Sequence, residues 1–73
     1  MKNKLEENFL EEIRKSKRIS REKLSKMSGV PTRAIKAYES GQVPLHRASY
    51  INVIQLAHSL EVKPADLFGG DLQ

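Results

Sequence analysis

Apolar residues recur along this chain at intervals of three and four, which is the spacing of one face of an α-helix. No stretch of four or more residues alternates between apolar and polar as a half-buried β-strand does. The pattern therefore predicts an all-α fold in which five short helices surround one core. The expected helices lie at about 5–16, 20–28, 32–40, 48–60 and 64–68.

Residues with known end preferences mark several of the predicted helix boundaries. Ser20 is a suitable N-cap for the second helix, because its hydroxyl can accept a hydrogen bond from a free backbone N–H. Gly29 is expected to end that helix and Gly41 the third, since glycine readily takes the left-handed conformation found at such ends. Pro31 suits the start of the third helix, and Thr32 beside it is a second candidate cap. Two short helices joined by a tight turn are thus expected within 20–41.

Helical spacing also separates the side chains expected in the core from those expected at the surface. The residues expected to face inward are Leu5, Phe9, Leu10, Ile13, Ile19, Leu24, Met27, Ala34, Ile35, Tyr38, Tyr50, Val53, Ile54, Ala57, Leu60, Leu67 and Phe68. The residues left on the outer face of the third helix are Thr32, Arg33, Lys36 and Ala37. A chain of 73 residues forms one domain, 1–73, and its tail at 69–73 is expected to be frayed.

Positive charge is concentrated in the first half of the chain. Residues 14–36 contain nine Lys or Arg and one acid, a net charge of +8, whereas the whole chain carries +4. A helical pair with so basic a surface is typical of proteins that bind nucleic acids.

Composition argues against several other functions. The chain has no cysteine, and His46 and His58 are far apart without acidic partners, so neither a disulfide nor a metal site is expected. No apolar run reaches the roughly 18 residues of a membrane span, and no signal-peptide core is present, so a soluble, cytoplasmic protein is expected. No nucleophile–base pair and no phosphate-binding loop is recognisable, so we expect no enzyme, no cofactor and no small-molecule ligand.

Sixteen residues between Ser20 and Phe68 form a pattern of small, apolar and polar side chains at defined spacings. They are Ser20, Leu24, Ser25, Gly29, Val30, Ile35, Tyr38, Glu39, Ser40, Gly41, Leu56, Ala57, Leu60, Val62, Leu67 and Phe68. From about residue 10 to residue 68 the chain thereby resembles the Cro/repressor-type (XRE-like) helix-turn-helix proteins. The resemblance implies a compact five-helix repressor-like domain. Its second and third helices would form a helix-turn-helix at about 20–41, with the recognition helix at about 32–40.

The resemblance also implies which residues contact DNA. They are Arg21, Thr32, Arg33, Lys36, Ala37, Ser40 and Gln42. The outer face of the third helix would read bases, with an apolar contact such as a thymine methyl at Ala37. Arg21 would contact a phosphate at the start of the second helix, where free backbone N–H groups attract anions. Ser40 and Gln42 would contact the DNA backbone across the groove, and Thr32 is expected to cap its helix, to contact DNA, or both.

In proteins of this kind an arginine of the first helix pairs with the glutamate near the end of the recognition helix. Arg14 and Glu39 occupy the matching positions, so a structural ion pair is expected between them.

The resemblance implies a sequence-specific, double-stranded DNA-binding transcriptional regulator, most simply a repressor that acts as a weak homodimer. Leu67 and Phe68, with Val62 and Leu45 nearby, are expected to form the dimer contact, to belong to the core, or both. The alternative function is an antitoxin or partner-binding module, which neutralises another protein and also binds its own operator.

Overall fold

The computed structural model describes residues 8–69 of the chain. Within this range there is no β-strand, and four α-helices alternate with two short 3-10 helices. In chain order these elements are α1 (Leu10–Ser16), α2 (Arg21–Ser28), α3 (Thr32–Ser40), η2 (Leu45–Arg47), α4 (Tyr50–Leu60) and η3 (Pro64–Phe68). None of the helices in the described range is long and apolar enough to cross a membrane.

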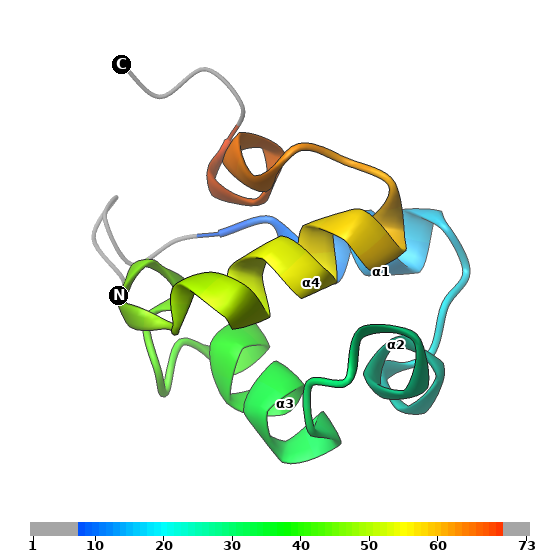
Figure 1. Cartoon of the computed structure of the whole chain (residues 1–73), viewed down its shortest axis with the longest axis horizontal. Helices are drawn as coiled ribbons and strands as arrows, with labels where there is room; N and C mark the ends of the chain where they lie inside the picture. Colours follow the sequence, from blue (N-terminus) through cyan, green and yellow to red (C-terminus); the bar gives the residue numbers. More distant parts are fainter. Residues whose placement is uncertain (1–7, 70–73) are drawn as a thin grey trace.

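One core is shared by all of these elements. Figure 1 shows α4 crossing the middle of the molecule, with α2 and α3 below it and η3 above it. Contacts join α4 to α2 and η3, α2 to α3, and α1 to α3 and η3. The largest fully buried side chains are Leu10, Leu24, Val30, Ile35, Leu45, Leu56, Leu60 and Leu67. Since each element supplies at least one of them, removing any element would open the same core.

The all-α prediction is confirmed, but the prediction of five helices is not. The last predicted helix is present as η3, a 3-10 helix of five residues. It begins at Pro64, and the backbone N–H of Lys63 before it donates a 2.9 Å hydrogen bond to the Asp66 carboxylate. Gly69 ends it with a φ of 109°. The segment between the proline and the glycine is too short for the hydrogen-bond ladder of a stable α-helix.

The first helix begins later than its hydrophobic pattern predicts. α1 starts at Leu10, whose backbone N–H donates a 3.0 Å hydrogen bond to the Asn8 side-chain oxygen. The Asn8 amide group in turn donates to the backbone oxygen of Tyr38 in α3, at 3.2 Å. This side chain therefore connects the start of α1 to the end of α3. Leu5, predicted to be buried, lies outside the described residues, as does the predicted frayed tail beyond Gly69.

Three apolar side chains predicted to lie in the core are exposed instead. Phe9 is 43% exposed, Met27 46% and Tyr50 80%. In α2 the next position after Met27 is the buried one, and it is taken by Ser28, whose hydroxyl accepts a hydrogen bond from the Val30 N–H at 3.1 Å. A polar residue at a buried position cannot be recognised from hydrophobic spacing.

The exposure of Tyr50 follows from how the chain enters α4. Leu45 in η2, which precedes α4, is fully buried and belongs to the core. The buried face of α4 therefore begins at Val53 and continues through Leu56 and Ala57 to Leu60. Tyr50, one turn earlier, lies beyond the region that the core covers. Residues 42–47, which lie between the predicted helices at 32–40 and 48–60, thus include a core residue.

Substitutions in α2 will distinguish its buried residue from its exposed one. Leu24→Ala should lower the free energy of unfolding by about 2–5 kcal/mol, because it leaves a cavity in the core. Met27→Ala should change it by no more than about 0.5 kcal/mol, because that side chain is half in solvent. Urea unfolding followed by circular dichroism measures both values. Equal losses in the two variants would contradict the placement of Met27.

Candidate nucleic-acid interface

The two helices of the predicted motif, α2 and α3, are joined by a well-defined turn. At the start of α2 the Ser20 hydroxyl accepts a 3.0 Å hydrogen bond from the Lys23 N–H, as predicted for an N-cap. Gly29 follows α2 with a φ of 79°, and its N–H donates to the Ser25 carbonyl at 2.8 Å. Val30 is then buried, so the chain is anchored in the core just before α3 begins.

The inner side of α3 is held by three other parts of the chain. Ile35 is fully buried in the core. The Tyr38 hydroxyl accepts a 3.0 Å hydrogen bond from the Asn52 amide in α4, and the Tyr38 carbonyl accepts one from Asn8. These attachments fix the rotation of α3 about its axis. The opposite face of the helix therefore projects from the domain in a defined orientation.

That outer face borders an open hollow in the protein surface. It is lined by Pro31, Arg33, Ala34, Lys36, Ala37, Ser40, Gln42 and Val43. Five of the seven predicted DNA-binding residues are therefore brought together, and the other two, Arg21 and Thr32, lie outside this lining. Arg33 and Lys36 are exposed, and within residues 8–69 neither forms an ion pair. Both charges are thus available to an incoming anion.

Thr32 does not cap α3. It is the first residue of the helix, and the capping position is held by Pro31, which makes no side-chain hydrogen bond to the helix. The capping interpretation is therefore wrong, because α3 begins one residue too early for the Thr32 hydroxyl to reach the next turn. Its predicted contact with DNA stays a prediction.

Hydrogen bonds order the end of α3. The Ser40 hydroxyl donates to the Ala37 carbonyl at 3.2 Å and accepts from the Gln42 N–H at 3.2 Å. Gly41 has a φ of 85°, and the Val43 N–H donates back to the Ala37 carbonyl. The backbone of Gln42 is thereby fixed next to the hollow while its side chain is exposed.

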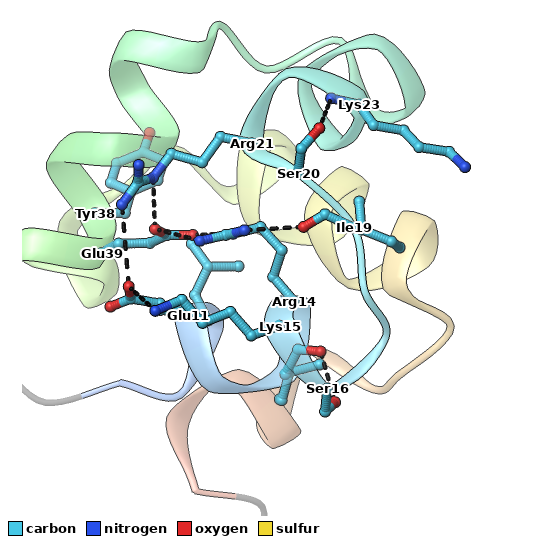
Figure 2. A network of polar contacts seen from close by, with 12 residues as sticks. Glu11, Arg14, Lys15, Ser16, Ile19, Ser20, Arg21, Lys23, Tyr38 and Glu39 are labelled. Atoms are coloured by element: carbon cyan, nitrogen blue, oxygen red, sulfur yellow. Dashed lines mark hydrogen bonds and ion pairs between the residues drawn. The ribbon is translucent and has the colours of Figure 1, made fainter.

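The predicted contact between Arg14 and Glu39 is present and buried (Figure 2). Arg14 Nε donates to Glu39 Oε2 at 2.6 Å and Nη2 donates to Oε1 at 3.2 Å, which is a bidentate arrangement. Arg14 Nη1 donates to the Ile19 carbonyl at 2.8 Å. Only 2% of the Glu39 side chain is exposed. The pair therefore joins α1 to α3 and also fixes the connection that leads into α2.

Arg21 belongs to the same network. Its Nε donates to Glu39 Oε1 at 2.8 Å, so two arginines share one buried carboxylate. Arg21 Nη2 lies 4.0 Å from Glu11 Oε2, and that carboxylate is also 3.0 Å from Lys15 Nζ. Unlike Arg14, Arg21 remains partly exposed. Arg21 is the first residue of α2. Its side chain is therefore hydrogen-bonded to the buried Glu39 on one side and partly exposed to solvent at the start of this helix.

A model of the helix-turn-helix family matches residues 10–67 of the chain. The protein belongs to this family. It is a DNA-binding regulator of the XRE type, and the family implies binding to double-stranded DNA. No curated protein and no solved structure gives a significant match. The assignment therefore rests on the family model together with the α2–turn–α3 geometry.

Sequence reasoning missed two members of the ion-pair network in this helix-turn-helix protein. Glu11 and Lys15 are four residues apart, a spacing that places them side by side on α1 and that can be read from the sequence. The hydrogen bond between Arg21 in α2 and Glu39 in α3 joins residues 18 positions apart, so no local sequence signal indicates it. Among residues 8–69, no group of three His, Cys, Asp or Glu is placed to hold a metal ion.

Charge pairing changes two pKa values in the network. The hydrogen bond to Glu39 raises the pKa of Arg14, so this buried guanidinium remains charged. The hydrogen bond from Lys15 lowers the pKa of Glu11, and the charges of Lys15, Arg21 and Arg14 act in the same direction. Glu11 therefore adds stability above its ordinary pKa, and this is lost as the pH falls through its lowered pKa. Because Glu11 is partly exposed, the contribution is small.

Single and double substitutions will measure the buried pair. Arg14→Ala and Glu39→Ala should each lower the free energy of unfolding by up to about 3–5 kcal/mol, because each leaves a buried charge without its partner. The double variant should lose clearly less than the sum of the two. Arg21→Ala should lose less than Arg14→Ala, because the remaining Arg14–Glu39 pair is intact. Additive losses in a urea-unfolding double-mutant cycle would show that the two side chains do not interact.

Proposed function

We propose that the protein is a sequence-specific transcriptional repressor, and that residues 32–40 enter the major groove of its operator. The observation that carries this proposal is the pair of exposed cations Arg33 and Lys36 on the outer face of α3, which form no ion pair within residues 8–69. The inner face of this helix is fixed to the core. A helix fits the roughly 12 Å width of the major groove. Long cationic side chains on a fixed helix are suited to reading base edges there.

Base reading would be divided among three neighbouring residues of α3. Arg33 and Lys36 carry the donors that pair with guanine O6 and N7. Ala37, half-buried beside them, offers only a methyl group, which suits a thymine methyl. The three line one hollow, so they would address adjacent base pairs.

Phosphate contacts would set the register of the helix on the duplex. Arg21 lies at the start of α2, where the backbone N–H groups add to its charge. Ser40 and Gln42 line the hollow where α3 ends, and Thr32 is the first residue of α3. Contacts of this kind position a protein without reading sequence. Repression would follow from occupancy of the operator, and the activity would be binding rather than catalysis.

We infer that two copies bind a palindromic site as a weak homodimer, because one small head supplies few contacts. Of the four predicted contacts, Val62 and Phe68 are half-buried against the core, so both remain candidates for the dimer surface. Leu45 and Leu67, predicted as candidate contacts, are fully buried and belong to the core. Tyr50 and Ile51 in the first turn of α4 are exposed apolar side chains and are further candidates. A two-fold contact there would leave α3 of each copy uncovered for its own half-site.

DNA binding and its division of labour can be tested with a duplex selected from a random pool by the purified protein. Arg33→Ala and Lys36→Ala should each lose about 1–3 kcal/mol of binding free energy on the selected site and relax the base preference locally. Arg21→Ala should weaken selected and arbitrary duplexes alike, and should reduce the slope of log K against log[salt] by about one. Fluorescence anisotropy at several salt concentrations measures both effects. Undetectable binding of every duplex at about 50 mM salt would contradict the proposed function.

Sedimentation at increasing protein concentration, with and without the selected duplex, tests the dimer. We expect a monomer–dimer equilibrium in free protein, two copies on a palindromic site, and half-sites separated by about 34–36 Å. Tyr50→Ser combined with Ile51→Ser should shift the free protein toward monomer. A single copy on a non-palindromic site would contradict this model.

A further inference from the structure

Two carboxylates face the guanidinium of Arg21, the residue proposed to contact phosphate at the start of α2. Glu39 Oε1 accepts the hydrogen bond of Arg21 Nε at 2.8 Å, and Glu11 Oε2 lies 4.0 Å from Arg21 Nη2 (Figure 2). These two carboxylates therefore offset part of the positive charge of Arg21 at the protein surface.

The two carboxylates differ in how firmly they are held. Glu39 is buried and also accepts two hydrogen bonds from Arg14, so its carboxylate is fixed in position. Glu11 is 37% exposed in the first turn of α1, and its ion pair with Lys15 is shorter than its contact with Arg21. Glu11 can therefore move away from Arg21 while it keeps its partner Lys15.

We propose that Glu11 competes with the DNA phosphate for Arg21 and thereby lowers the affinity of this interface for DNA. The inference rests on the proposed phosphate contact of Arg21. A phosphate binds a guanidinium through the same paired oxygens as a carboxylate, so the two anions address the same donors. A phosphate that approaches Arg21 from solvent also meets the negative charge of Glu11 about 4 Å from the guanidinium. Because phosphate contacts carry no sequence information, the effect applies to every duplex.

Glu12 provides a matched control on the same helix. It is the adjacent residue, it is exposed, and it makes no ion pair within residues 8–69. Its side of α1 borders a different hollow, lined with it by Phe9, Ile13, Ser16, Asp66 and Gly69. Glu11→Gln and Glu12→Gln change the net charge equally, so long-range electrostatics contributes similarly to both. Only the first removes a carboxylate that contacts Arg21.

The experiment measures binding of each full-length variant to a fluorescein-labelled duplex of arbitrary sequence by anisotropy at low salt. Glu11→Gln should tighten binding about two- to fivefold relative to wild type, the range expected from releasing a partly exposed ion pair. Glu12→Gln should tighten it clearly less. In an Arg21→Ala background the Glu11→Gln gain should largely disappear, which separates release of Arg21 from release of Lys15. Thermal unfolding of each variant verifies that the fold is retained.

Each other result overturns the inference. If wild type binds DNA but Glu11→Gln leaves the affinity unchanged, Glu11 is no competitor, and the proposed function stands. If Glu11→Gln weakens binding, Glu11 orients Arg21 for the phosphate instead. Equal gains in affinity in Glu11→Gln and Glu12→Gln would show that the effect comes from net charge. A gain that persists in the Arg21→Ala background would show that it comes from the release of Lys15. If wild type binds no duplex, the proposed function fails and this inference fails with it.

Discussion

The Glu39 carboxylate lies where α1, α2 and α3 meet, and the geometry of the reading surface depends on it. It accepts hydrogen bonds from Arg14 of α1 and Arg21 of α2, while its own backbone is part of α3. A carboxylate so deeply buried is costly unless it is paired and hydrogen-bonded, and here its two guanidinium partners meet that requirement. Because Arg14 also binds the Ile19 carbonyl, the connection between α1 and α2 is fixed by the same group. A movement of any one helix would break bonds to the other two.

This junction explains how a short helix can present a rigid surface. α3 has nine residues, too few for stable helix formation by itself in water, so its conformation and rotation depend on tertiary contacts. Ile35 and Tyr38 attach its inner face to the core and to α4, and Glu39 attaches its end to α1 and α2. Arg33 and Lys36 on the opposite face are exposed and form no ion pair among the described residues. The inner face of α3 therefore contributes to stability, and its outer face is left free for recognition.

Much of this architecture was predictable because it depends on interactions within a few residues of sequence. The Ser20 cap and the left-handed glycines at positions 29 and 41 lie where their chemistry predicts. Helical periodicity correctly predicts an all-α fold and the approximate positions of α2, α3 and α4. The contact between Arg14 and Glu39 was expected only from the resemblance to a known family, since residues 25 positions apart give no local signal.

What the sequence by itself determined is therefore local: the helical segments, their caps and turns, and the basic character of the α2–α3 surface. Tertiary structure decided which of two neighbouring candidates is buried. Ser28 rather than Met27 is buried in α2, and Leu45 in the connection is buried whereas Tyr50 at the start of α4 is exposed. It also decided that Arg21 shares a buried carboxylate and faces Glu11. The physical reason is that burial and ion pairing depend on side chains brought together from distant positions, whereas helix caps and helical period depend on residues at most a turn or two apart.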